Sequence, residues 1–150
     1  MSSKRSSALS LTVQYACADA QLPPRPRLRR WVERALEAKT ASAQITLRFV
    51  DAAESRRINR QFRGRDKPTN VLSFPYAGPP ALAGDLLLCV PVVGAEAVRQ
   101  GKDAVAHYAH LVVHGMLHLQ GYDHENSADA ERMEAKEREI LARLSYPDPY

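Results

Sequence analysis

Three histidines in the second half of the chain have the spacing of a metal site. His114 and His118 are four residues apart, which on an α-helix places them on one face, about 6 Å apart along the axis. Gly121 can adopt the left-handed conformation that reverses the chain, and this would return His124 toward the same point. Three imidazoles leave the fourth tetrahedral position open for a water with a pKa near about 7, as in catalytic zinc sites. The pattern predicts one zinc ion, although nickel and copper also accept imidazole.

Two further histidines precede this group on the same predicted helix. His110 lies one turn before His114, but it is about 12 Å along the axis from His118 and cannot share that residue's ion. We therefore expect His107 and His110 to be structural, or to orient the ligands through hydrogen bonds.

The spacing from His114 to His124 matches the zinc-protease pattern H-E-x-x-H-x-x-G-x-x-H with one departure. Gly115 stands where those enzymes carry the glutamate that acts as general base. The departure argues against a peptidase, and another group must then act on the water or the leaving group. Asp123, beside the third ligand, and Asp85, at the head of an apolar strand, are the candidate catalytic acids. Asp85 is equally well explained as a turn cap.

Hydrophobic periodicity predicts the elements that position these groups. Strands are expected at 11–15, 45–49 and 86–90, the last buried on both faces, together with a short strand that ends at Pro75. Helices are expected at 27–38, at 51–64 with a capping box at Asp51 and Glu54 and with Ile58 and Phe62 inward, and at 92–100, 104–120 and 128–144. Asp103 is expected to cap the fourth of these. This order predicts an α+β fold: a single mixed β-sheet covered by helices, with a zincin-like metal-binding helix followed by a glycine turn. We expect one domain, residues 1–150, with residues 1–8 loose.

The composition is that of a globular protein with a mild basic bias. The net charge is +4, and 45% of the residues are hydrophobic. Basic residues gather at 25–30 and 56–67, which is compatible with an anionic partner. No apolar run is long enough to cross a bilayer or to act as a signal peptide, so we expect a cytoplasmic protein without a membrane partner. Cys17 and Cys89 are expected to be buried thiols in a reducing compartment.

Three segments together resemble the YbeY family of bacterial rRNA-processing endoribonucleases: HGMLHLQGYDH at 114–124, NRQFRGRDKPTNVLSFP at 59–75 and GDL at 84–86. The similarity extends to the DPY at 148–150. The resemblance implies an α+β fold, zinc on the three histidines, and a single-strand-specific, metal-dependent endoribonuclease. It also implies roles in 16S rRNA 3′-end maturation and ribosome quality control, with the small ribosomal subunit and its assembly factors as partners. Arg63 matches an arginine that is functionally critical in that family.

A functional role for Arg63 is chemically reasonable, because a guanidinium can bind the non-bridging oxygens of a phosphodiester bidentately as charge develops on them. Without the resemblance, Arg63 would be read as an exposed charge near a helix C-terminus. Arg65 and Lys67 would extend a positive surface along the RNA backbone, and Ser73, with Asn70, would shape the cleft wall. Two alternatives stay open: a zinc peptidase that recruits its base from elsewhere, and a non-catalytic ribosome-assembly factor with a structural metal.

Overall fold

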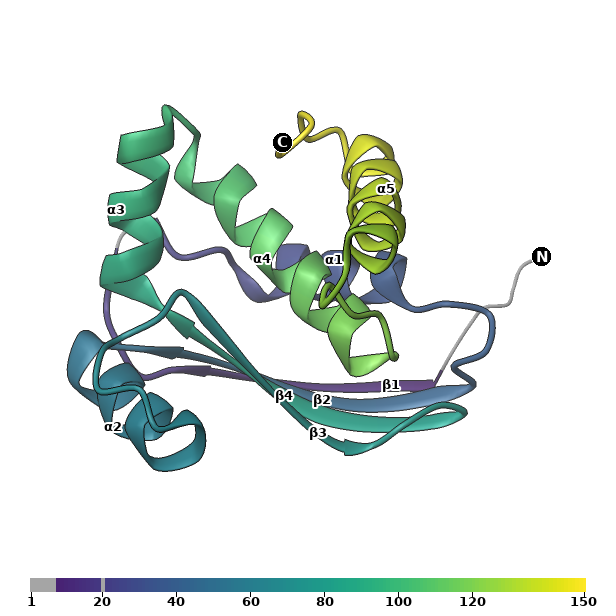
Figure 1. Ribbon diagram of the computed structural model, residues 1–150, viewed down its shortest axis with the longest axis horizontal. Coiled ribbons are helices and arrows are strands. Elements are labelled where there is room, and N and C mark those ends of the chain that lie inside the picture. The colour runs from purple at the N-terminus through teal and green to yellow at the C-terminus, as the bar shows by residue number, and fades with distance from the viewer. Residues whose placement is uncertain (1–7, 20) are drawn as a thin grey trace.

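The computed structural model describes residues 8–19 and 21–150, which form four strands and five helices. Figure 1 shows their arrangement. The elements, in chain order, are β1 (Ala8–Tyr15), α1 (Arg25–Ala35), β2 (Ser42–Val50), α2 (Ala52–Arg63), β3 (Val71–Ala77), β4 (Ala81–Cys89), α3 (Val90–Gln100), α4 (Ala104–Leu119) and α5 (Ser127–Arg143).

The four strands form one mixed sheet in the order β1-β2-β4-β3. β1 pairs with β2 and β2 pairs with β4 in parallel, whereas β3 runs antiparallel to β4 and forms an edge of the sheet. The prediction of an α+β fold with a single mixed sheet is thereby confirmed. As an edge strand, β3 has one side without a paired strand within the described chain.

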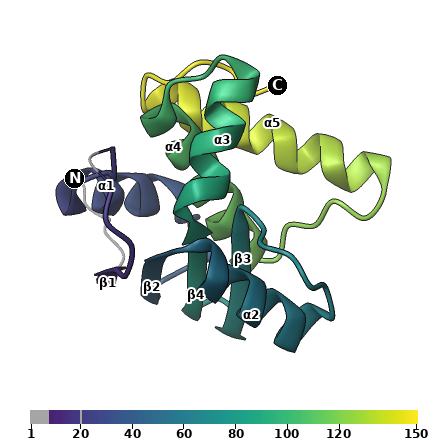
Figure 2. The ribbon, with the colours of Figure 1, turned by 90° about the vertical axis from the view of Figure 1, so that its left-hand side faces the viewer.

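One face of the sheet is covered by helices, and α2 lies on the other side. Figure 1 shows α1, α4 and α5 on one side of the sheet and α2 on the other, and Figure 2 shows α1 toward β1 and α5 toward β3. Side chains alternate along each strand, so every second residue of β2 and β4 enters the core beneath the helices. Trp31 of α1, Phe49 of β2 and Met116 of α4 are among the large side chains buried there.

Helix α4 approaches the sheet so closely that a Cβ at either of two glycines would collide with a leucine side chain. A Cβ added at Gly115 would lie 2.8 Å from Leu86 Cδ2, and a Cβ added at Gly84 would lie 2.8 Å from Leu119 Cδ2. These contacts show that Gly84 and Leu86 of β4 face α4. Because neighbouring residues of a strand point to opposite faces, Asp85 faces the other side of the sheet.

Several expected boundaries were wrong. β3 continues past Pro75 to Ala77, which an edge strand tolerates because the proline nitrogen need not donate to a neighbour. β4 ends at Cys89 and α3 begins at Val90, with a proline at its second position, where a missing N–H costs nothing. β4 is not buried on both faces, since the residues that point away from α4 are only partly covered. Ala8 belongs to β1, and the rest of the segment expected to be loose, residues 1–7, lies outside the described residues.

Helix α2 also differs from its expected amphipathic pattern. Asp51 accepts from the Glu54 N–H as an N-cap, but the Glu54 carboxylate pairs with Arg48 instead of completing a capping box. The buried residues of α2 are polar: Ser55 exchanges hydrogen bonds with Thr69, and Asn59 Nδ2 donates to the carbonyl of Lys67. Phe62, expected to point inward, is 60% exposed. These bonds fasten the loop after α2 to the helix.

Three smaller expectations can be checked. Asp103 is the N-cap residue of α4, but its side chain makes no capping hydrogen bond. Cys17 and Cys89 are both free thiols; Cys89 is buried, as expected, and Cys17 is half-buried. None of the helices in the described chain has the length and apolar character needed to cross a membrane.

Candidate functional site

The main polar cleft lies along the edge strand β3, and its volume is about 700 Å³. Parts of the chain that are distant in sequence meet there: the end of α2, the loop before β3, β3 itself, α4, and the loop that follows α4. The lining residues are Phe62, Arg63, Thr69, Asn70, Val71, Leu72, Ser73, Phe74, His114, His118, Asp123, His124 and Glu125.

The turn at the end of α4 returns the third histidine to the other two. Gly121 has φ +106°, and the N–H groups of Gly121 and Tyr122 bond back to the carbonyls of His118 and Leu117. This pair of bonds is a Schellman motif, which satisfies the last helical carbonyls while the chain reverses. The ring centroid of His124 consequently lies 5.6 Å from that of His114 and 6.2 Å from that of His118.

These distances bear on whether the rings can hold a metal ion. Across residues 8–19 and 21–150, no three His, Cys, Asp or Glu side chains are already grouped as metal ligands. Three imidazoles bound tetrahedrally at about 2.1 Å would have centroids about 5 Å apart. The rings around His124 would therefore need to close by roughly 1 Å, a movement within reach of side-chain rotation. Three imidazoles brought together by this movement are a donor set that fits a transition-metal ion.

Glu137 of α5 orients the first of these rings. Its side chain has no exposed surface, and its Oε2 lies 2.6 Å from His114 Nδ1, while its Oε1 lies 2.9 Å from His110 Nε2. Burial alone would raise the pKa of Glu137, but the hydrogen bonds from His110, His114 and Tyr150 outweigh it and hold the pKa at about 2. The ionised carboxylate can only accept, so His114 donates from Nδ1 and its Nε2 is left as the ligand atom.

The expectation that His107 and His110 are structural or orienting fits what surrounds them. His107 is buried and its Nε2 lies 2.8 Å from Glu96, which also accepts from the amide of Asn70 at the cleft wall. Desolvation lowers the pKa of His107. His110 shares Glu137 with His114 and so contributes to that carboxylate's position.

The protonation of His118 also suits a ligand. Desolvation lowers the pKa of His118, and the neighbouring rings of His114 and His124 lower it further. A neutral imidazole, rather than an imidazolium, is the form that binds a metal.

The structure brings some of the predicted site residues together and leaves others apart. Arg63, Asp123 and Ser73 line the cleft with the three histidines. Arg65 and Lys67 are exposed in the loop after α2 and do not line it. Asp85 is not brought to the histidines either. It lies on the opposite face of the sheet, where its Oδ2 accepts a 2.7 Å hydrogen bond from the Tyr76 hydroxyl.

Comparison with known proteins identifies the family. Residues 14–145 match the family described as Endoribonuclease YbeY. The chain belongs to the YbeY family. An Endoribonuclease YbeY from Halorhodospira halophila is 53% identical over 151 residues, covering 96% of this chain and 97% of its own length. One from Alkalilimnicola ehrlichii is 55% identical over 152 residues, covering 95% and 92%.

The fold is shared with a solved structure. The solution structure of TM1509 from Thermotoga maritima superposes with a TM-score of 0.61 at 23% identity, covering 91% of this chain and 92% of that one. The resemblance inferred from the sequence motifs is thus confirmed for the family and the fold. The names of the relatives agree with the endoribonuclease expected from sequence, and they favour neither the peptidase nor the non-catalytic alternative.

The packing of Gly115 disfavours a side chain at the position of the protease glutamate in this YbeY chain. Gly115 does not line the cleft, and a Cβ at this position would point at Leu86, in the core. A glutamate at 115 would have to displace that leucine before its carboxylate could reach any substrate.

Sequence reasoning missed two features of the YbeY cleft. Phe62 and Phe74 form an edge-to-face pair with centroids 5.3 Å apart at the mouth of the cleft, beside Arg63. Glu137 was missed as well, although a signal existed: it occupies the same helical stripe as Met133, Ile140 and Leu141, and a glutamate on an apolar stripe requires a buried partner.

Proposed function

We propose that this chain is a metal-dependent, single-strand-specific endoribonuclease, and that it acts in 16S rRNA 3′-end maturation and ribosome quality control. The observation that carries the proposal is the cleft in which Arg63 meets His114, His118 and His124. An arginine beside three imidazoles suits a phosphodiester, whose non-bridging oxygens gain charge during cleavage. The names of the YbeY relatives support the same reaction.

The residues of the cleft would divide the work between binding and charge stabilisation. The three histidines would hold one zinc ion, which when bound supplies a Lewis acid for the phosphate. Arg63 would bind the non-bridging oxygens, and Asp123, whose Oδ1 accepts from the backbone N–H of His124, would accept a proton from the attacking hydroxyl. Arg63 and Asp123 line the same cleft.

Single-strand specificity would follow from the aromatic pair. Phe62 is 60% exposed, and an unpaired base can stack on its face, whereas a base held inside a duplex cannot leave its neighbours without an energetic cost. Arg65 and Lys67 would contact the backbone outside the cleft, and Ser73 would contact it within. The chain would work as one domain in the cytoplasm, with the small ribosomal subunit and its assembly factors as partners.

The test is cleavage of an end-labelled single-stranded RNA by the purified protein, with the matching duplex as comparison. We expect cleavage of the single strand that is lost with a chelator and in His114→Ala. Arg63→Ala should lower kcat/KM by about 10²–10³-fold, the usual loss for one charge-stabilising donor. Arg99→Ala is the control, because Arg99 is an exposed arginine on α3 that does not line the cleft. Cleavage that survives both the chelator and His114→Ala would refute the proposal.

A further inference from the structure

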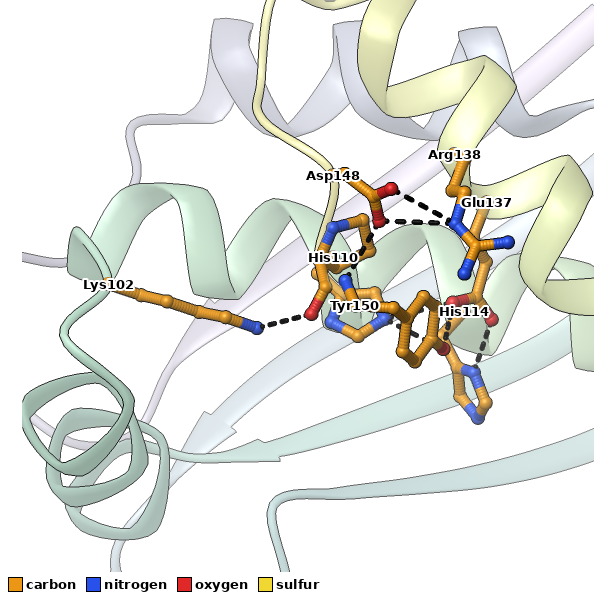
Figure 3. Close-up of polar contacts among 8 residues, drawn as sticks. Lys102, His110, His114, Glu137, Arg138, Asp148 and Tyr150 are labelled. Atoms are coloured by element: carbon orange, nitrogen blue, oxygen red, sulfur yellow. Dashed lines mark hydrogen bonds and ion pairs between the residues drawn. The ribbon is translucent and has the colours of Figure 1, made fainter.

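The buried carboxylate of Glu137 has a third donor that comes from outside the histidine helix. The hydroxyl of Tyr150 donates to Glu137 Oε1 at 2.5 Å, the same oxygen that lies 2.9 Å from His110 Nε2. The other oxygen, Oε2, lies 2.6 Å from His114 Nδ1. Figure 3 shows the Tyr150 ring lying between the segment that carries it and the Glu137 carboxylate. One oxygen is therefore occupied by Tyr150 and His110, and the other is left for His114.

The segment 145–150 is held in place by contacts with several different elements. Ser145, at φ +69°, turns the chain back, and the Tyr146 ring then packs edge-on against Trp31 of α1, with centroids 5.8 Å apart. Lys102, in the loop between α3 and α4, donates from Nζ to the Pro149 carbonyl at 3.0 Å. These contacts fix the path of the segment that carries Tyr150.

The side chain of Tyr150 is positioned on both sides. Arg138 of α5 lies 5.2 Å from its ring centroid and also bonds the Asp148 carboxylate at 3.2 Å. Asp148 in turn accepts from the backbone N–H of Tyr150 at 2.9 Å. The ring is thereby fixed with its hydroxyl aimed at Glu137. Burial and the adjacent Glu137 raise the pKa of Tyr150, so the hydroxyl stays protonated and remains a donor.

We propose that Tyr150 is a positioning residue of the histidine site: by holding Glu137 Oε1, its hydroxyl fixes the carboxylate so that Oε2 accepts from His114 Nδ1 and His114 presents Nε2 to the cleft. Without the Tyr150 hydroxyl, Oε1 would keep only the 2.9 Å contact with His110 Nε2, and the less firmly held carboxylate could rotate and offer His114 a poorer angle. The outer partners of a metal-binding histidine set its tautomer and ring orientation. The inference rests on the proposed metal role of His114, and it adds a residue more than thirty positions away to the apparatus that aims this ring.

The first test reads the ring itself and does not need the metal. Long-range ¹H–¹⁵N NMR spectra of the full chain in chelator report which nitrogen of His114 carries the proton. We expect the Nδ1–H form in the wild type and a mixture of both forms in Tyr150→Phe, which keeps the ring but removes the hydroxyl. Tyr146→Phe is the matched control, because it lies in the same segment and its hydroxyl is not a donor to Glu137. A tautomer unchanged in Tyr150→Phe would overturn the inference.

The second test measures Zn²⁺ affinity by competition with a chelator of known affinity. Glu137→Gln should weaken binding by about 10–100-fold, as removal of an outer partner of a metal ligand does. Tyr150→Phe should weaken it by about threefold to tenfold, the equivalent of one hydrogen bond of roughly 1 kcal/mol. If Tyr150 acts through Glu137, the double variant should be no weaker than Glu137→Gln alone. The inference would be contradicted if the two losses of Zn²⁺ affinity multiplied in the double variant. Equal affinities of Tyr150→Phe and Tyr146→Phe would contradict it as well.

The two tests also separate this inference from the proposed function. A wild-type protein that binds no Zn²⁺ and cleaves no RNA would refute the metal-dependent nuclease, while the His114 tautomer would still decide whether Tyr150 positions the ring. If the protein cleaves RNA but Tyr150→Phe changes neither its metal affinity nor the His114 tautomer, the inference is refuted and the proposed function is not.

Discussion

Replacing Gly115 with alanine tests whether packing against the sheet excludes a side chain at the position of the protease glutamate. The new Cβ would lie 2.8 Å from Cδ2 and 2.9 Å from Cδ1 of Leu86, whose side chain is fully buried in the core. Overpacking of this kind typically costs about 1–3 kcal/mol. Against this, alanine in a helix interior is favoured over glycine by roughly 0.5–1 kcal/mol.

Gly94→Ala is the matched control, because Gly94 is also inside a helix and a Cβ there meets nothing within 4 Å. We expect Gly94→Ala to stabilise the protein by roughly 0.5–1 kcal/mol and Gly115→Ala to fall below it by about 1–3 kcal/mol. In a protein of this length that difference corresponds to about 2–12 °C in Tm. Urea and thermal unfolding of both variants in the same chelated buffer would measure it.

The steric origin can be tested by making room. Leu86→Val by itself should destabilise by about 1 kcal/mol, but in the Gly115→Ala background it should cost less, because it shortens the side chain that the new Cβ meets. If Gly115→Ala proves as stabilising as Gly94→Ala, the packing argument is refuted.

Two further predictions concern buried polar groups. The pKa of Glu137 is lowered from 4.5 to about 2, so its contribution to stability, on the order of 3 kcal/mol, is complete above about pH 4.5 and is lost as the pH falls toward 2. Urea unfolding between pH 5 and 2.5 should show a shallower loss in Glu137→Gln than in the wild type or in the exposed control Glu131→Gln. Gln120, which is 1% exposed, accepts from the Glu37 N–H and donates to the Ala35 carbonyl. Gln120→Leu should therefore cost about 2–4 kcal/mol, against little for the exposed Gln44→Leu, and an equal effect of the two would contradict this.

Local sequence was sufficient wherever the relevant geometry is itself local. The period of α4 and the glycine after it predict that His114, His118 and His124 converge, since a helical turn and a chain reversal involve only neighbouring residues. Hydrophobic periodicity predicted the helices and strands for the same reason. The errors concerned where elements end and which faces of α2 and β4 are buried. The α+β class and the YbeY family were likewise readable from the chain.

The tertiary structure decided which distant groups meet these residues. Asp85 stands in an almost continuous apolar run, so its direction depended on the register that turns Gly84 and Leu86 toward α4. The exposure of Phe62 depended on polar bonds from α2 to the following loop.

The Glu137 carboxylate reaches His114, and the Tyr150 hydroxyl reaches Glu137, only because α5 and the segment 145–150 fold back over α4. A hydrophobic pattern specifies which side of an element is buried, but it carries no information about which element covers that side. The sequence alone therefore predicted that His114, His118 and His124 lie together. Only the packing of α5 on α4 decided which groups hold His114 in position.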